Sequence, residues 1–325
     1  MKAASDALQH QSVSGPGGSV GLTGEGPPLP DDLRACIEPV SPFRGESDSL
    51  DASQLKLCFT CWSCAVECPV NRFTSRLNPV KLLRMAHLGL MDELLECPDI
   101  WYCLSCGRCS RICPMKVKPS ALIAHLRYQA VEMGVRPPNL PSLLADHNRK
   151  FQRRRRRAMS ACVEGSRLQE SPGDWETPGE ASSGGEAHVD IVLPEFSQRG
   201  AFRKEAGRHL GFSTGSSLCY TCCQCRNACP VCFEREVFDP LFFIRVTNLG
   251  LRRLALNSPS LWLCIQCESC THACPMGVKG HLVIRQLQSM ACRERVFPGR
   301  VLSQWHDVQK DLYCAHLDRI DGLLT

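Results

Sequence analysis

The sequence predicts an all-α protein built from two tandem copies of one helical module. Residues 58–118 recur at residues 219–279 without a gap, each position shifted by 161 (219 − 58 = 161). Within each copy, apolar residues recur about every 3.6 positions between prolines, and no segment alternates as a strand does. An ungapped repeat of this length indicates that one compact domain was duplicated.

Two segments of each copy are typical of helices. In the first copy, Pro79 suits an initial helical turn, LLRMAHLGLMDELL has helical apolar spacing, and Pro98 ends the pattern. After the second group of cysteines, Pro119 precedes SALIAHLRYQAVEM, and Gly134 is a suitable C-terminal cap. The repeat places equivalent landmarks at 240, 250 and 259 of the second copy.

This pattern divides the chain into five parts. They are a flexible leader at 1–50, a first module at 51–135, a linker at 136–217, a second module at 218–300 and a C-terminal amphipathic helix at 301–325. The leader is rich in Ser, Gly and Pro, and the linker contains ESPGDWETPGEASSGGE. Such compositions cannot bury enough apolar surface to fold alone, so we expect a partly disordered linker.

Two further features lie outside the modules. The linker holds five consecutive arginines, Arg153 to Arg157, which we expect to be a solvated linker element; an acidic partner surface or RNA is the alternative. The C-terminal helix has an apolar stripe, which we expect to dock on its own domain and not on a partner. The stripe consists of Val301, Trp305, Val308, Leu312 and Ile320.

Cysteine chemistry is the main functional signal, because the chain has 23 cysteines among 325 residues. The first thirty residues offer no apolar core of a secretory signal, and no apolar run is long enough to span a bilayer. We therefore expect a cytoplasmic protein without direct membrane insertion, whose reduced thiols are available as metal ligands.

Sixteen of the cysteines fall into four copies of C-x2-C-x2-C-x3-C-P. This spacing is typical of 4Fe–4S ligands, and in paired motifs the fourth cysteine ligates the cluster of the other motif. The sequence therefore predicts four 4Fe–4S clusters, two in each module, with crossed ligation. The four ligand sets are Cys58, Cys61, Cys64 and Cys113; Cys103, Cys106, Cys109 and Cys68; Cys219, Cys222, Cys225 and Cys274; and Cys264, Cys267, Cys270 and Cys229.

Structural zinc and disulfides are the alternative interpretations of these motifs. Zinc sites use pairs of cysteines separated by a longer loop, not three cysteines within seven residues. Four clusters of charge about −2 each would offset the formal net charge of +5, which disfavours nucleic-acid binding.

The remaining cysteines have no cysteine at the repeat-equivalent position. They are Cys36, Cys97, Cys162, Cys223, Cys232, Cys292 and Cys314. We expect inert thiols, with Cys223 and Cys232 the strongest candidates for another role because they flank a cluster loop. Repeat-equivalent Trp101 and Trp262 precede motifs, and we expect them to pack over a cluster and exclude water.

Each module resembles the ferredoxin subunit of heterodisulfide reductase, which is the C subunit of that enzyme. It is also similar to the α-helical ferredoxin domain of the iron–sulphur subunits of succinate dehydrogenase and anaerobic glycerol-3-phosphate dehydrogenase. The resemblance rests on the paired motifs, the 34 residues between them, the Pro, Gly-Leu and Pro landmarks and the PMxVK tail. It covers about 80 residues of each repeat and implies two tandem α-helical ferredoxin modules.

The resemblance implies a non-catalytic electron-transfer subunit. In that family, the ferredoxin subunit passes single electrons from one partner to another, between a flavin-containing chain and a catalytic chain with CCG-type cysteine clusters. The present chain has two modules, no CCG-type cluster and no G-x-G-x-x-G dinucleotide fingerprint. Two alternatives remain: an iron–sulphur subunit of a flavoprotein dehydrogenase or quinone-linked oxidoreductase, and a reductase in its own right.

Overall fold

In each module, a capping side chain and a proline mark the start of the first helix between the two cysteine motifs that is longer than two turns. The computed structural model describes residues 55–166 and 195–325. Asn78 accepts hydrogen bonds from two backbone N–H groups of the first turn, and the repeat-equivalent Asp239 accepts one from Leu241. Pro79 and Pro240 follow these caps, because proline has no N–H to leave unpaired there.

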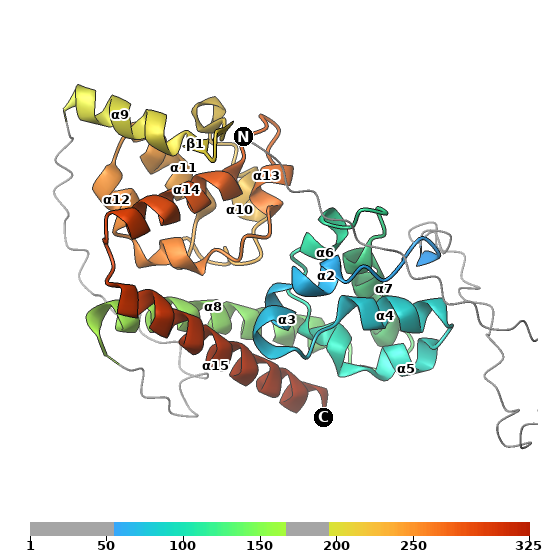
Figure 1. Ribbon diagram of the computed structural model, residues 1–325. Helices are drawn as coiled ribbons and strands as arrows, with labels where there is room; N and C mark the ends of the chain where they lie inside the picture. The colour runs from blue at the N-terminus through green and yellow to red at the C-terminus, as the bar shows by residue number, and fades with distance from the viewer. Residues whose placement is uncertain (1–54, 167–194) are drawn as a thin grey trace, which may run out of the picture. The chain divides into compact units, whose positions relative to one another are not determined.

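The first module consists of short helices around two cysteine loops (Figure 1). Its elements are α2 (Ser63–Val66), α3 (Pro69–Thr74), α4 (Pro79–His87), α5 (Met91–Glu96), the 3-10 helix η2 (Pro98–Tyr102), α6 (Arg108–Arg111) and α7 (Pro119–Glu132). Its core is apolar and includes Leu82, Leu94, Ile100 and Leu122, all almost fully buried.

The second module repeats this arrangement and adds a helix and a hairpin before it. Its elements are α9 (Phe196–Ala206), β1 (Arg208–His209), β2 (Phe212–Ser213), η4 (Ser216–Leu218), α10 (Gln224–Asn227), α11 (Pro240–Leu249), α12 (Arg252–Leu256), η5 (Pro259–Leu263), α13 (Ser269–His272) and α14 (Gly280–Arg293). The antiparallel pair β1–β2 forms the only sheet of the described residues. The predicted all-α class and the tandem modules are confirmed.

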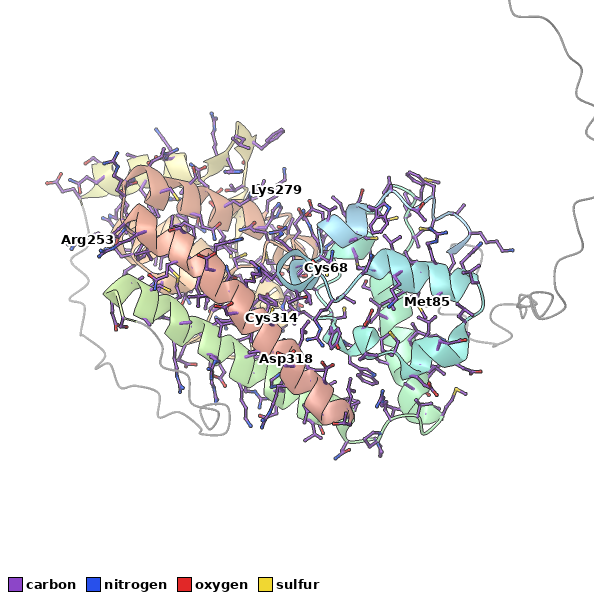
Figure 2. The ribbon with its side chains drawn as sticks, turned by 60° about the horizontal axis from the view of Figure 1, so that its bottom comes forward. Cys68, Met85, Arg253, Lys279, Cys314 and Asp318 are labelled. Atoms are coloured by element: carbon purple, nitrogen blue, oxygen red, sulfur yellow. The ribbon has the colours of Figure 1, made fainter. Side chains whose placement is uncertain are left out.

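A long helix follows each module, α8 (Leu140–Glu164) and α15 (Gly299–Leu324), and the two lie side by side (Figures 1 and 2). The His147 and His316 rings stack at 4.6 Å, and Phe151 stacks on His316 at 4.0 Å. Shifted by 161, α8 falls on residues 301–325, so the two helices are the last element of one longer repeat. All the described residues belong to one compact unit.

Each long helix packs on the module to which it is not joined in sequence. From α15, Tyr313 stacks on Phe73 of α3 at 4.9 Å, and Asp321 accepts a 2.5 Å hydrogen bond from the Tyr102 hydroxyl of η2. From α8, the guanidinium of Arg155 donates to the carbonyl oxygen of Leu263 in η5 at 3.1 Å. The C-terminal helix α15 therefore packs on α8 and on elements of the first module.

The arginine run is part of α8, and its side chains are not all solvated. Arg155 is 0% exposed and Arg154 is 8% exposed, whereas Arg153 forms an ion pair with Glu234 and Arg156 donates to Ser160 at 2.6 Å. The expectation of a solvated run is wrong for Arg154 and Arg155, because both side chains are buried. Residues 167–194 of the predicted linker, and the leader, lie outside the described residues, whereas residues 196–213 of that linker form α9, β1 and β2.

Candidate metal centres

All four cysteine loops have the same backbone shape. In each loop the second residue after the first cysteine, and the residue after the second cysteine, adopt the left-handed conformation with φ between 53° and 68°. The first position holds Thr60, Ser105, Thr221 and Gln266, and the second holds Trp62, Gly107, Cys223 and Glu268. Left-handed non-glycine residues are uncommon. Repeated left-handed residues curl the chain into a concave nest whose N–H groups favour anions, as in many iron–sulphur sites.

In the first module, each fourth cysteine lies beside the other motif. One cavity is lined by Cys58, Cys61, Cys64 and Cys113, which we call outer site 1. A second cavity, inner site 1, is lined by Cys68, Cys103, Cys106 and Cys109. Each encloses about 330 Å³ including space open to solvent, and apolar side chains supply much of the remaining wall. These are the groupings that the crossed assignment predicts.

The second module repeats the arrangement. The cavity called outer site 2 is lined by Cys219, Cys222, Cys225 and Cys274, and Cys270 also reaches it. Inner site 2 consists of Cys229, Cys264, Cys267 and Cys270. Burial raises the pKa of Cys229 well above its ordinary value, and the nearby Cys267, Cys264 and Cys270 sulphurs add to the rise.

The outer and inner sites of one module adjoin each other. Burial, together with the nearby sulphurs of Cys103, Cys68 and Cys64, raises the pKa of Cys109 to about 12. Cys64 belongs to outer site 1, so the third cysteines of the two motifs lie close together. The same holds in the second module. Burial is the main cause of the raised pKa of Cys270, and the sulphurs of Cys264, Cys267 and Cys225 add to it.

Exposure differs between the thiols of outer site 1. Burial and the adjacent Cys58 and Cys113 sulphurs raise the pKa of Cys64 to about 11. Cys61 is exposed, and hydrogen bonds from the Ser63 hydroxyl and backbone lower its pKa. The buried thiols are therefore protonated at neutral pH in the metal-free chain, and metal binding must displace their protons.

The donor set fits a 4Fe–4S cluster. Each site offers four thiols, a soft donor set suited to iron–sulphur clusters, within largely apolar walls and an anion-favouring backbone nest. Among the described residues, no group of three His, Cys, Asp or Glu side chains is arranged to hold a single metal ion.

Three guanidinium groups lie beside the inner sites, and no sequence motif marks them. Arg127 donates to the carbonyl oxygens of Ile100, Trp101 and Cys103, at 2.7, 3.0 and 2.6 Å, and burial lowers its pKa. Arg155 donates to Leu263, directly before inner site 2. The third is Arg111, which donates to the carbonyl oxygen of Cys106.

None of these three arginines forms a salt bridge with an Asp or Glu of the described residues. Arg155 is buried, whereas Arg111 and Arg127 are half-buried. A charge shielded from water is costly unless compensated, and a bound anionic cluster would supply negative charge there. The helical spacing of Leu144, Phe151, Arg155, Ala158 and Cys162 was the available sequence signal for the buried position of Arg155.

The spare cysteines occupy varied surroundings. Cys223 lines outer site 2 at a left-handed position, where its thiol donates to the Thr221 carbonyl at 3.5 Å. Burial raises the pKa of Cys232 to about 11. Cys162 is buried, Cys292 is exposed, and Cys97 and Cys314 are half-buried, whereas Cys36 lies outside the described residues.

The two tryptophans before the motifs also differ. Trp101 is 3% exposed, and Cζ of the Arg127 guanidinium lies over the Trp101 ring, 5.7 Å from the ring centroid. Trp262 is half-buried and meets Phe297 edge to face. Lys118 and Lys279, which are equivalent in the two repeats, are both exposed to solvent.

Comparison with protein families matches a 4Fe–4S dicluster domain at residues 53–117 and again at 215–278. The chain carries two such domains in tandem. The predicted 4Fe–4S chemistry and the repeat are therefore confirmed, while the number of clusters and their ligands remain predictions. No helix among the described residues is long and apolar enough to cross a membrane.

Curated relatives carry the same kind of name. The chain is 39% identical over 87 residues to a protein of Archaeoglobus profundus named as similar to the C subunit of heterodisulfide reductase, covering 26% of this chain and 46% of that protein. It is 40% identical over 80 residues to the second iron–sulphur C subunit of the CoB–CoM heterodisulfide reductase of Methanocaldococcus jannaschii, covering 25% and 42% respectively. The resemblance to the C subunit of heterodisulfide reductase is confirmed.

A third relative is the C2 subunit of the H2/formate:CoB–CoM heterodisulfide, ferredoxin reductase of Methanococcus maripaludis. Identity is 36% over 102 residues, covering 31% of this chain and 53% of that protein. The chain thus spans about half the length of the curated relatives that it matches. No solved structure matches the chain.

Proposed function

We propose that this chain is a non-catalytic electron-transfer subunit that holds four 4Fe–4S clusters. When bound, such clusters accept and release single electrons at potentials that depend on hydrogen bonds, burial and charge. The sixteen motif cysteines supply the ligands in the crossed sets. The observation that carries the proposal is the cavity in which Cys68 joins Cys103, Cys106 and Cys109, because a fourth cysteine there comes from the other motif.

The protein contributes ligands, insulation and charge. Buried apolar side chains such as Val80 and Leu83 line part of outer site 1. The guanidiniums of Arg111, Arg127 and Arg155 place positive charge beside the inner sites. Cysteine ligation requires reduced thiols, which supports a cytoplasmic location.

The proposed partners are the flavin-containing and the CCG-type catalytic subunits of a heterodisulfide reductase-like complex. The support is the naming of the relatives as C subunits of such reductases. Anaerobic affinity purification from the source cells tests the assignment. Co-purifying flavin together with a CCG-containing chain is the expected result, whereas a membrane-anchored dehydrogenase would overturn it.

Cluster stoichiometry tests the cofactor assignment directly. Anaerobically purified chain should hold about sixteen iron and sixteen acid-labile sulphide atoms, since sixteen cysteines supply four ligands to each of four clusters. Cys229→Ser should reduce the intact 4Fe–4S content by one cluster, whereas Cys292→Ser, at an exposed spare cysteine, should leave it unchanged. Eight irons per wild-type chain, or stoichiometric zinc, would contradict the proposal.

A further inference from the structure

The inner cysteine loops of the two modules touch each other. A single nitrogen of the Arg111 guanidinium, Nη2, donates to the carbonyl oxygens of both Cys106 and Cys267, each at 2.5 Å. The two oxygens are therefore separated by at most twice that distance. The Ser269 hydroxyl donates to the Cys106 carbonyl at 3.0 Å and also accepts from Arg111 at 3.0 Å. One side chain thus joins an inner loop of each module.

A second arginine bridges the same two loops through charge. Arg108 pairs with Glu67 of its own module at 2.7 Å and with Glu268 of the second module. The Arg108 side chain is only 15% exposed, so this pairing is better shielded from water and salt than an ordinary surface pair.

The repeats have diverged where the loops meet, and the differences are complementary. Under the shift of 161, Gly107 corresponds to Glu268, Arg108 to Ser269 and Arg111 to His272. The first module supplies the cations, and the second supplies the carboxylate and the hydroxyl. Two copies of the first loop would bring arginines against arginines, so this contact suits unlike partners.

Glycine at position 107 leaves room for the Arg111 side chain that reaches both carbonyls. Gly107 has φ of +68°, and a Cβ built there would lie 2.7 Å from Arg111 Nη1. The repeat-equivalent Glu268 carries its side chain outward to Arg108 instead. The small residue on one loop and the acidic residue on the other therefore serve the same junction.

Pairing of the loops also buries the middle cysteine of each inner motif. Cys106 is 8% exposed and Cys267 is 7% exposed. The corresponding cysteines of the outer sites are more open, since Cys61 is exposed and Cys222 is half-buried. The outer sites therefore face solvent, whereas the inner sites face each other.

We propose that Arg111 is a positioning residue that fixes the two inner sites against each other as a single junction. This proposal rests on the proposed function. The sites then follow one another in the order outer site 1, inner site 1, inner site 2 and outer site 2, and the two outer sites are the ends open to partners. The two modules then form one continuous path and not two independent carriers.

The test uses the intact, cluster-loaded chain and the variants Arg111→Ala and Arg253→Ala. Arg253 is an exposed arginine on α12 and serves as the control (Figure 2). In Arg111→Ala, the magnetic interaction between the reduced inner clusters should weaken in electron paramagnetic resonance, compared at equal iron content per chain. The control should retain the wild-type spectrum. An unchanged interaction in Arg111→Ala would overturn the proposal.

Amide hydrogen exchange provides a second readout that does not depend on cluster signals. Loss of the shared donor should accelerate exchange roughly tenfold at residues 104–112 and 265–273 together, because both loops lose a charge-assisted hydrogen bond. A purely local role would accelerate only residues 104–112 and would contradict the junction. Arg111→Lys retains the charge but not the fork of donors, and should recover only part of the protection.

If Arg111→Ala does not fold, Ser269→Ala tests the same junction from the other module. This change removes hydrogen bonds without burying a charge, and it should loosen the same two segments. A wild-type chain without 4Fe–4S clusters would refute the proposed function, while coupled exchange of the two loops would still report on the junction. The two proposals therefore fail separately.

Discussion

The outer and inner cysteine sites share a motif and a backbone shape but differ in their surroundings. In outer site 1, Cys61 is exposed, and the Ser63 hydroxyl and backbone lower its pKa. In inner site 1, the equivalent Cys106 is buried, and burial raises its pKa far above the ordinary value. The spacing of the cysteines determines which thiols assemble, whereas neighbouring elements determine how strongly the site is shielded from water.

The difference extends to the side chains around the sites. Phe59, Trp62 and Tyr220 beside the outer loops are more than half exposed, at 59%, 53% and 58%. Around the inner sites, guanidinium groups and the α8–α15 pair take the place of solvent. Burial and local charge are two of the factors that set iron–sulphur potentials, so we expect inner and outer clusters to differ in potential.

The largest expected effect follows from crossed ligation. Cys68→Ser should damage the cluster of inner site 1 and leave the signal of outer site 1 intact, because Cys68 lines the inner cavity although it lies in the first motif. Cys61→Ser should damage outer site 1 instead, and Cys97→Ser should affect neither, since Cys97 lines none of the cysteine cavities. Electron paramagnetic resonance of the reduced variants separates the signals. Loss of the same cluster in Cys68→Ser and Cys61→Ser would contradict crossed ligation.

The next effect concerns acid and the helix pair beside the inner sites. Burial, with the nearby charges of His147 and Arg155, holds the pKa of His316 well below its usual range. The folded protein therefore resists protonating His316, whereas the unfolded chain binds that proton near pH 6.5. The stabilising effect of neutral His316 is complete above pH 6.5 and is lost as pH falls, by up to about 1.4 kcal/mol per pH unit.

His316→Phe should remove this contribution to the pH dependence. Its free energy of unfolding should fall less steeply below pH 6.5 than that of the wild type, as measured by denaturant titration at several pH values. His87→Phe, at an exposed position on α4, should retain the wild-type slope. If the free energy of unfolding has the same pH dependence in His316→Phe and in the wild type, protonation of His316 does not contribute to acid destabilisation.

The smallest expected effect is a change in stability at one equivalent backbone position of the outer and inner loops. Trp62 and Gly107 occupy equivalent left-handed positions of the outer and inner loops, with φ of 64° and 68°. Trp62→Gly should stabilise the chain by up to about 1 kcal/mol, because glycine adopts this conformation without the steric cost of a side chain. Gly107→Ala should destabilise it by about 1–2 kcal/mol, through that cost and the clash with Arg111. Thermal unfolding of both variants is the measurement, and equal effects would contradict the assigned difference between the loops.

The sequence by itself determined the repeat, the all-α class and the cofactor chemistry. These follow from local rules: cysteine spacing sets which thiols can surround a cluster, and Pro79 and Pro240 mark helix starts. The predicted grouping of Cys68 with the second motif is also the grouping that lines the inner cavity, although ligation itself remains a prediction.

How the two repeats combine depends on long-range contacts that the sequence does not reveal. A helical apolar stripe shows that a helix has a face to bury, but not which element covers it, so the docking of α15 on the first module could not be read from Trp305 or Leu312. Likewise, nothing near Arg155 in sequence indicates that the acceptor for its guanidinium is the Leu263 carbonyl, 108 residues away. The Arg111 junction depends on a contact between segments 156 residues apart, and such non-local contacts exist only once both modules are folded.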